Sequence, residues 1–164
     1  MKKSFVPDDF KVPGKLETGK FRLRMLSVDD LEKDYEAVMS SVEHLKDFFG
    51  PGTGWPSPDM TIEYDLKDLE WHQQEFIERK SFAYTVMSLD ESVCLGCVYF
   101  KPSKAPQFDV MTFSWVRASE LANNLDEELY HVVKQWLDRK WPFKNVAFPG
   151  REIDWDTWQQ LLTK

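Results

Sequence analysis

The sequence is poor in the residues that build metal centres, disulfide frameworks and glycine-rich loops. Its 164 residues include only two cysteines, three histidines and seven glycines. Two cysteines are too few for a disulfide scaffold or for a zinc site made of cysteine alone. Basic residues number 21 against 28 acidic ones, which gives a formal net charge of -7, and they form no dense stripe. We therefore expect no nucleic-acid partner, because such a surface must neutralise phosphates.

Long apolar runs are absent as well. No uncharged apolar stretch approaches the roughly 18 residues that a membrane helix needs. Pro7, Asp8 and Asp9 interrupt the N-terminal region where a secretory signal would have its apolar core. These absences predict a cytoplasmic protein that does not act in a membrane. With 42% hydrophobic and 15% aromatic residues, the chain has enough apolar surface to bury one core.

The two cysteines, Cys94 and Cys97, have the C-x-x-C spacing of redox and zinc motifs. They lie in an apolar run that is typical of a strand, and residues three apart on a regular strand point to opposite faces. A redox C-x-x-C usually opens a helix, and no second cysteine pair is present to complete a zinc site. We therefore predict no metal site, and a thiol redox protein is the alternative that this pair leaves open.

The N-terminal half predicts an arm, a strand and two helices. Residues 1–20 contain prolines and glycines with little periodicity, so we expect an extended arm ahead of a single domain over residues 21–164. Alternating apolar residues from Phe21 predict a half-buried strand. Residues 27–30 have the form of a capping box, and helical spacing behind them predicts one helix from about Val28 to the mid-forties. The glycine- and proline-rich residues 50–58 must form a loop, and a second helix follows that ends near Arg79 and Lys80.

The C-terminal half predicts a sheet completed by a crossover. Strands are expected at residues 82–87, 93–100 and 108–116, with a turn between the first two that is short enough to make them antiparallel. The clearest helical stripe follows, with Asn124 as its N-cap and Glu127 three positions on. A short strand at residues 144–148 would then lie parallel to the strand before the helix. Asp154 is expected to cap a last short helix.

This order of elements resembles that of the GNAT-type N-acetyltransferase superfamily. The likeness rests on Phe21-Arg-Leu-Arg-Met-Leu followed by two aspartates, on Gly96 in mid-strand, and on Trp115-Val-Arg117 before the long helix. It extends from about Phe21 to Leu162, and it implies an α+β fold with α/β/α layers and a mixed central sheet flanked by helices. Because the sequence stops at Lys164, we expect the two further strands that the family often has to be absent. A homodimer partner or the N-terminal arm would then cover that edge, or the edge would stay exposed.

In that family, acetyl-CoA lies in a wedge between the strand before the long helix and the strand after it. The resemblance therefore implies acetyl-CoA as cosubstrate, with its pantetheine arm on the first strand and its pyrophosphate at the helix N-terminus. The implied coenzyme contacts are Phe113, Ser114, Trp115, Val116, Arg117, Asn123 and Asn124. The family usually has a glycine-rich turn after the basic residue, because only bare backbone approaches phosphates closely. Here no glycine follows Arg117, and four carboxylates lie within residues 120–128.

Acetyl transfer also needs a base that deprotonates the acceptor ammonium. The candidates are His72 and Glu75 on the second predicted helix and Asp109 at the start of a strand, although residues in such positions are more often ordinary packing or surface residues. Many relatives use a tyrosine near the last helix to protonate the leaving thiolate, whereas this chain has Trp155 and Trp158 there.

Three aromatic residues, Phe48, Phe49 and Trp55, flank the glycine- and proline-rich loop. This region lines the acceptor pocket in GNAT-like proteins, so the resemblance implies that these rings enclose the substrate. Plugging the edge of the core would explain Trp55 equally well.

Two hypotheses of function follow. The first is an N-acetyltransferase that transfers an acetyl group from acetyl-CoA to a primary amine of a small molecule or peptide by direct attack. The alternative is a GNAT-fold ligand- or protein-binding module that has lost its coenzyme chemistry. The missing glycines favour the alternative, and the order of elements favours neither.

Overall fold

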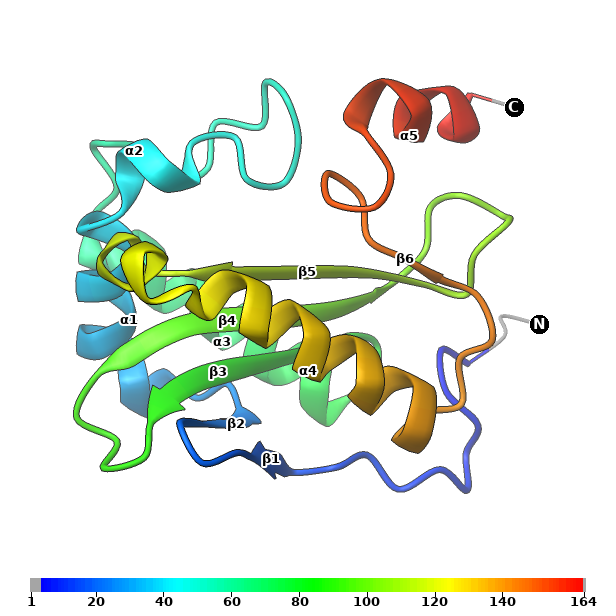
Figure 1. Cartoon of the computed structure of the whole chain (residues 1–164), viewed down its shortest axis with the longest axis horizontal. Coiled ribbons are helices and arrows are strands. Elements are labelled where there is room, and N and C mark those ends of the chain that lie inside the picture. Colours follow the sequence, from blue (N-terminus) through cyan, green and yellow to red (C-terminus); the bar gives the residue numbers. More distant parts are fainter. Residues whose placement is uncertain (1–3, 164) are drawn as a thin grey trace.

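Six strands follow one another in sequence order across one mixed sheet (Figure 1). The computed structural model describes residues 4–163. The strands are β1 (Lys15–Glu17), β2 (Phe21–Met25), β3 (Phe82–Ser88), β4 (Cys94–Pro102), β5 (Val110–Val116) and β6 (Val146–Ala147). The helices are η1 (Val28–Asp30), α1 (Leu31–Met39), α2 (Val42–Leu45), α3 (Ile62–Ile77), η2 (Ala118–Asn123), α4 (Leu125–Lys140) and α5 (Trp155–Leu162). All neighbouring strands are antiparallel except β5 and β6, which are parallel. The predicted α+β fold with a mixed sheet is confirmed.

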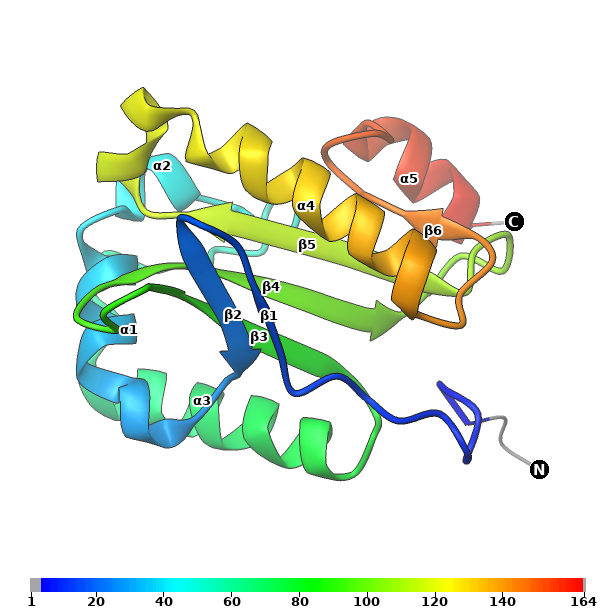
Figure 2. The same cartoon turned by 60° about the horizontal axis from the view of Figure 1, so that its bottom comes forward.

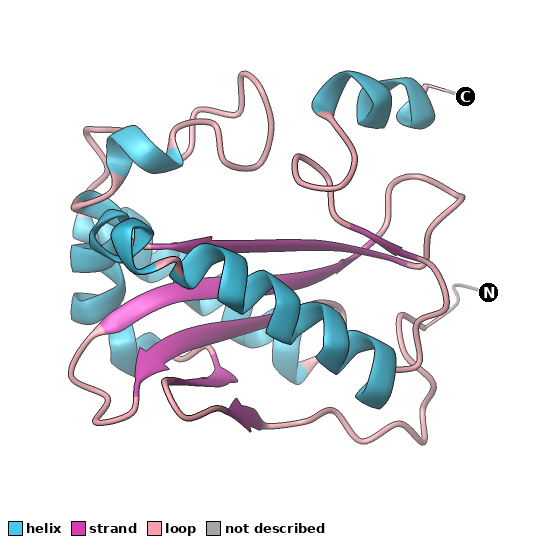
Figure 3. Ribbon diagram, in the orientation of Figure 1, coloured by secondary structure: helices cyan, strands magenta, loops and turns pink. Residues whose placement is uncertain are grey.

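The helices cover the two faces of this sheet unequally. α4 lies on one face, and α1 and α3 lie on the other (Figure 2). The buried apolar residues accordingly form two clusters: one contains Trp136 and Leu137 of α4, and the other contains Ala37 of α1 and Leu69 of α3. The α2–α3 loop and α5 both lie at the β5 edge of the sheet (Figure 3). Within residues 4–163, no helix combines the length and apolarity needed to span a membrane.

The prediction of one continuous helix from Val28 to the mid-forties is wrong. It divides into η1, α1 and α2, with a break at Ser40 and Ser41. The Ser41 hydroxyl is used outside the helix, where it accepts a hydrogen bond from the Ala118 backbone N–H at 2.8 Å. The predicted capping box is only half formed. Ser27 Oγ accepts from the Asp29 N–H at 3.1 Å, but the Asp30 carboxylate pairs with Arg24 instead of returning to the backbone.

The N-terminal arm lies against the core on the α4 face. Phe5 stacks on Phe82 and Phe143 with ring centroids 5.7 and 5.0 Å apart, and Val6 is buried. Further along, residues 15–17 form β1, which pairs with β2. Sequence patterning missed this strand because three residues are too few to show a period.

An irregularity in β4 overturns the expected orientation of the cysteines. The ladder pairs Val86 with Gly96 but Met87 with Cys94, so β4 has one extra residue. Cys94 and Cys97 therefore both face the cluster on the α1 and α3 side, because a bulge shifts the alternation by one residue. Both thiols are free and buried, and burial raises the pKa of each. They stay protonated and act as small apolar side chains.

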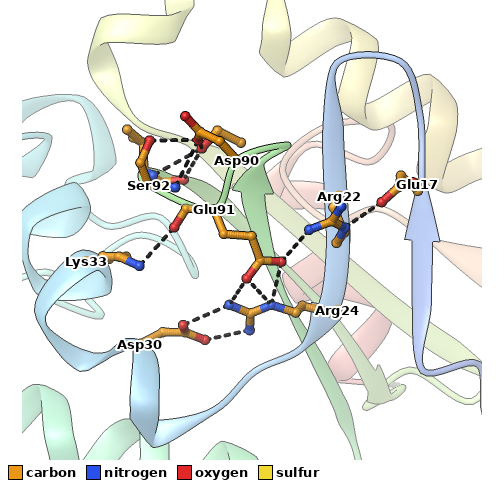
Figure 4. Close-up of polar contacts among 10 residues, drawn as sticks. Glu17, Arg22, Arg24, Asp30, Lys33, Asp90, Glu91 and Ser92 are labelled. Atoms are coloured by element: carbon orange, nitrogen blue, oxygen red, sulfur yellow. Dashed lines mark hydrogen bonds and ion pairs between the residues drawn. The ribbon is translucent and has the colours of Figure 1, made fainter.

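A network of ion pairs holds β2 to the β3–β4 turn and to η1 (Figure 4). Arg24 pairs with both oxygens of Asp30 at 2.7 and 2.9 Å, and its Nη2 also donates to Glu91 at 2.9 Å. Arg22 donates to the other Glu91 oxygen at 2.7 Å. The carboxylate of Glu91 therefore joins two arginines of one strand, and the Lys33 ammonium holds the Glu91 carbonyl at 2.8 Å.

We expect Glu91→Gln to lower the free energy of unfolding by about 1 kcal/mol at pH 7, because it removes one charge from a half-exposed network. Hydrogen bonds from Arg24 and then Arg22 lower the pKa of Glu91 from 4.5 to about 2. A lowered native pKa stabilises the fold above pH 4.5, and this contribution is lost as the pH falls toward 2. Urea unfolding at pH 7 and pH 3 checks this, with the exposed Glu32→Gln on α1 as control. An equal effect of Glu91→Gln at both pH values would contradict it.

Gly96 allows β4 and β5 to approach each other closely. A Cβ atom at this position would lie 2.0 Å from the Trp115 carbonyl oxygen. We expect Gly96→Ala to lower the free energy of unfolding by roughly 1–3 kcal/mol, as overpacking does. Gly19, whose added Cβ would meet nothing within 4 Å, supplies the matched control Gly19→Ala. Equal unfolding midpoints for the two variants would rule out the steric explanation.

Candidate functional site

The parallel strands β5 and β6 separate after two paired positions. Val110 pairs with Val146 and Met111 pairs with Ala147. From Thr112 to Val116, β5 continues without a strand on that side among residues 4–163, while its other side stays paired with β4. A wedge therefore opens along β5, at the end of the strand that leads to α4. This is the arrangement that the resemblance implied.

A cavity of about 380 Å³ lies in this wedge. Its volume is within the range of small-molecule sites, about 300–1,000 Å³. We call it the wedge cavity, and its lining residues are Phe48, Thr112, Phe113, Ser114, Asp126, Phe148, Pro149, Gly150, Arg151 and Trp155. They come from the α2–α3 loop, β5, the first turn of α4, the segment after β6 and the start of α5. Two implied coenzyme contacts, Phe113 and Ser114, are among them.

Thr112 is a buried polar residue in the wall of the wedge cavity. The residue is only 2% exposed, and its Oγ1 atom has no hydrogen-bond partner within residues 4–163. A buried hydroxyl without a partner is unfavourable by about 1–3 kcal/mol. It is also the type of group that a polar ligand in the cavity could bond. Sequence patterning did not identify Thr112, because a threonine in a strand has no distinguishing signal.

The end of β5 is held by α1 and α2. Arg117 donates to both oxygens of Glu36 at 2.8 and 2.6 Å and to the Cys94 carbonyl at 3.2 Å. His44 Nε2 donates to the Val116 carbonyl at 3.1 Å. The hydrogen bond with Glu36 raises the pKa of Arg117. The guanidinium predicted to meet the pyrophosphate is therefore occupied by α1. The implied contacts Trp115 and Val116 lie beside it, and the Trp115 side chain faces the α1 and α3 cluster.

The N-terminus of α4 differs from the predicted capping box. Asn124 occupies the N-cap position in a left-handed conformation, with φ of 59°, and its side chain makes no cap hydrogen bond. Glu127 pairs with His131 at 3.0 Å instead of returning to the cap. Asn123 donates to Glu120 at 3.0 Å. The first turn therefore has no side-chain cap on its N–H groups, although it carries three acidic residues.

An ion pair joins α4 to the segment after β6. Arg151 Nη2 lies 2.9 Å from both carboxylate oxygens of Asp126, and both residues line the wedge cavity. The Arg151 guanidinium also lies 4.9 Å from the centre of the Tyr130 ring. The neighbouring Glu152 accepts from Lys134 and from the Tyr130 hydroxyl. Sequence reasoning missed Arg151; its position directly after the Pro149–Gly150 turn was the available signal.

The predicted acceptor residues come together at the β5 edge. Phe49 lies 4.9 Å from Phe48 and 5.2 Å from Trp55, measured between ring centroids. Phe49 also contacts Phe113 at 5.3 Å, and Trp55 contacts Trp115 at 6.2 Å. The three predicted rings therefore form one cluster with two aromatic residues of β5. Phe48 alone of the three reaches the wedge cavity.

The three predicted bases lie outside the lining of the wedge cavity; His72 and Glu75 are three residues apart on α3, and Asp109 precedes β5. His72 is buried on α3 with its ring 5.2 Å from Tyr99, and burial, followed by the charge of Lys101, lowers its pKa to about 3. It is therefore neutral at physiological pH. Glu75 accepts from the Ser81 hydroxyl at 3.3 Å. Asp109 accepts from the Lys144 and Asn145 backbone N–H groups at 2.7 and 3.0 Å, where β5 and β6 are still paired.

Asp68 on α3 is a titratable group that sequence reasoning missed. Burial, followed by the charge of Asp65, raises its pKa to about 6, and Lys101 opposes the shift. Asp68 lies 3.6 Å from His72 Nε2, and the Lys101 ammonium lies 4.8 Å from the Phe49 ring centre. The spacing of four residues from His72 was the signal that placed Asp68 on the same helix face. Residues 4–163 contain no cluster of three His, Cys, Asp or Glu that could hold a metal.

Comparisons with known proteins identify the fold. No protein-family model and no curated protein matches the sequence. Among solved structures, the ribosomal-protein-S5-alanine acetyltransferase from Vibrio fischeri matches 91% of this chain and 80% of its own, with 14% identity and a TM-score of 0.63. A ribosomal L7/L12 alpha-N-protein acetyltransferase in complex with coenzyme A matches 78% and 68% of the two chains, with 14% identity and a TM-score of 0.57.

A third structure, the microcin C7 self-immunity acetyltransferase in complex with acetyl-CoA and AMP, matches 77% of this chain and 68% of its own, with 15% identity and a TM-score of 0.52. Identities this low show a shared fold, and they leave the activity to be argued from the site. The chain has the fold of the GNAT acetyltransferases.

Proposed function

We propose that this protein is a CoA-dependent N-acetyltransferase that acts on a primary amine of a small molecule or peptide. The observation that carries the proposal is the free edge of β5 beside the wedge cavity. A strand edge presents backbone N–H and C=O groups that an extended amide-bearing chain can pair with. The pantetheine arm of coenzyme A is such a chain. The unpartnered Thr112 hydroxyl adds a polar group at the same place.

The proposed ligand lies along Phe113, Ser114, Trp115 and Val116 with its phosphates toward Asn123, Asn124 and the start of α4. The first-turn N–H groups of α4 have no side-chain cap, and such groups favour an anion. The acceptor amine enters from the opposite side, where Phe48, Phe49 and Trp55 form the aromatic cluster. Aromatic faces there attract an ammonium and exclude water from the thioester.

The reaction is a direct acyl transfer. The acceptor ammonium loses a proton, its nitrogen forms a bond to the thioester carbon, the carbon–sulfur bond breaks, and the leaving sulfur takes up a proton. A base works best when its pKa lies near the working pH. Of the acidic and basic groups around the aromatic cluster, Asp68 fits with a pKa of about 6, whereas His72 with a pKa of about 3 does not. Asp68, like the three predicted bases, is not part of the wedge-cavity lining, so it would act from the side of the aromatic cluster. There its neighbour Lys101 lies 4.8 Å from the Phe49 ring centre, and we propose Asp68 as the base.

A GNAT-fold binding module without coenzyme chemistry is the second candidate, and two contacts favour it. Arg117 is held by Glu36, and Arg151 is held by Asp126 inside the wedge cavity. In the absence of ligand, a carboxylate already neutralises each guanidinium. The two functions differ in a simple prediction, since only the first requires the wedge cavity to bind coenzyme A.

We expect coenzyme A to stabilise the protein. A ligand at about 100 times its dissociation constant adds about 2.7 kcal/mol to the native state, which thermal unfolding with and without coenzyme A would detect. Thr112→Val should change the stability of the free protein and its affinity for coenzyme A in opposite directions. It should raise the midpoint without ligand, because an unsatisfied hydroxyl is removed, and it should lower the affinity for coenzyme A. Absence of any shift at millimolar coenzyme A would favour the binding module.

We expect Asp68→Asn to lower kcat/KM for acetyl transfer by roughly 10²-fold, the usual contribution of a general base. In the unsubstituted protein, kcat/KM should fall as the pH is lowered through about 6, because Asp68 becomes protonated; the variant should lose that dependence. The exposed Glu70→Gln on the same helix is the control. A variant that keeps the pH dependence of the unsubstituted protein would show that another group is the base.

A further inference from the structure

The ion pair between Asp126 and Arg151 lies across one side of the wedge cavity. Asp126 belongs to the first turn of α4, whereas Arg151 belongs to the turn that follows β6. Both oxygens of Asp126 lie 2.9 Å from Nη2 of Arg151. About a third of the Asp126 side chain and about a quarter of the Arg151 side chain remain exposed. The pair therefore joins two walls of the cavity while it stays accessible to a ligand from solvent.

The contacts around Arg151 leave most of its guanidinium available. Five N–H donors are present on the group, and within residues 4–163 only Nη2 is hydrogen-bonded. The ring of Tyr130 supports one face of the group at 4.9 Å. The backbone next to it is held separately, because Glu152 is bonded to Lys134 and Tyr130. Opening the pair therefore requires only side-chain movement.

The charges favour exchange of one anion for another. Arg151 is neutralised by a single carboxylate, whereas a phosphate group has more acceptor oxygens in a geometry that suits a guanidinium. Moving Asp126 away also removes one negative charge from the end of α4, where the N–H groups have no side-chain cap. A phosphate that replaces Asp126 can therefore bind the Arg151 guanidinium and the free N–H groups of α4 at the same time.

We propose that the Asp126–Arg151 pair is a latch over the wedge cavity, which a phosphate-bearing ligand opens by taking Arg151 from Asp126. Arg151 then takes the phosphate-binding place that the resemblance gave to Arg117, because Arg117 is paired with Glu36 of α1. The identification of that ligand as coenzyme A rests on the proposed function. The latch itself requires only a phosphate ester or diphosphate at the end of an extended chain.

The latch predicts opposite effects for its two partners. Asp126→Asn frees Arg151 and should tighten coenzyme A binding by about tenfold, whereas Arg151→Gln should weaken it by about tenfold, which are the changes expected for one charge-assisted contact. Glu127→Gln is the matched control. It removes the same charge from the same helix turn, but Glu127 pairs with His131 and does not line the cavity. Thermal unfolding without ligand checks that each variant is folded.

The experiment is calorimetric titration of the four proteins with coenzyme A, pantetheine and inorganic pyrophosphate. Opposite changes in coenzyme A affinity for the two latch variants, with unchanged pantetheine affinity and no change in the control, are expected. Coenzyme A binding that is equal in all four proteins would overturn the latch and leave the proposed function intact. An equal gain in coenzyme A affinity in Asp126→Asn and Glu127→Gln would show that the gain comes only from less repulsion between the acidic first turn of α4 and the phosphates. That result would also overturn the latch.

The pyrophosphate titration separates the two proposals if coenzyme A does not bind. Pyrophosphate binding that strengthens in Asp126→Asn and is lost in Arg151→Gln would support the latch while the proposed function fails. Absence of pyrophosphate binding to Asp126→Asn, together with absence of coenzyme A binding, would overturn both.

Discussion

The site depends on one constraint in the backbone: β6 cannot stay paired with β5 beyond Ala147. The Phe148 carbonyl accepts N–H groups from Arg151, Glu152 and Ile153 at 3.1, 2.9 and 3.3 Å, so the chain turns sharply after the strand. Gly150 within this turn has φ of 81°, and a Cβ atom there would lie 2.6 Å from the Trp155 ring. Only glycine meets both conditions without strain. The turn directs the chain away from β5 and leaves the strand edge open.

The two sides of the open edge are built differently, and each side suits one half of an acyl transfer. On the side of α4, polar and charged groups surround the cavity: the Thr112 hydroxyl, the uncapped helix end and the Asp126–Arg151 pair. On the side of α1 and α3, aromatic rings of the α2–α3 loop pack on β4 and β5. A phosphate-bearing carrier and a hydrophobically enclosed amine would therefore meet at the strand between them.

Sequence patterning predicted most of the order of elements and the parallel crossover, because these depend on periodicity and on local caps such as Asp154, whose carboxylate accepts from the Thr157 N–H at 2.8 Å. The wedge was implied by the resemblance to the GNAT superfamily and not by the pattern of residues. It failed where a distant partner decides the outcome. The break at Ser41 depends on Ala118, and the position of Arg117 depends on Glu36. The shared face of the two cysteines depends on a bulge that has no residue signature in this strand.

Three of the residues singled out in the sequence, Phe48, Phe113 and Ser114, line the wedge cavity, and their role in binding stays a prediction. The aromatic residues Phe48, Phe49 and Trp55 do pack together beside β5, although only Phe48 lines the wedge cavity. Thr112, Asp68 and Arg151 were missed because what distinguishes them is burial and contact with residues from other parts of the chain. Such properties are not visible in a pattern of residue types.

Hydrogen exchange of backbone amides, followed by mass spectrometry with and without coenzyme A, tests the open edge of β5 most directly. A ligand that pairs with that edge should slow exchange in residues 110–117 and at the start of α4, while the β1–β2 pair on the far side of the sheet exchanges as before. Unchanged exchange along β5 at saturating coenzyme A, or slowing confined to another surface, would contradict a binding site in the wedge.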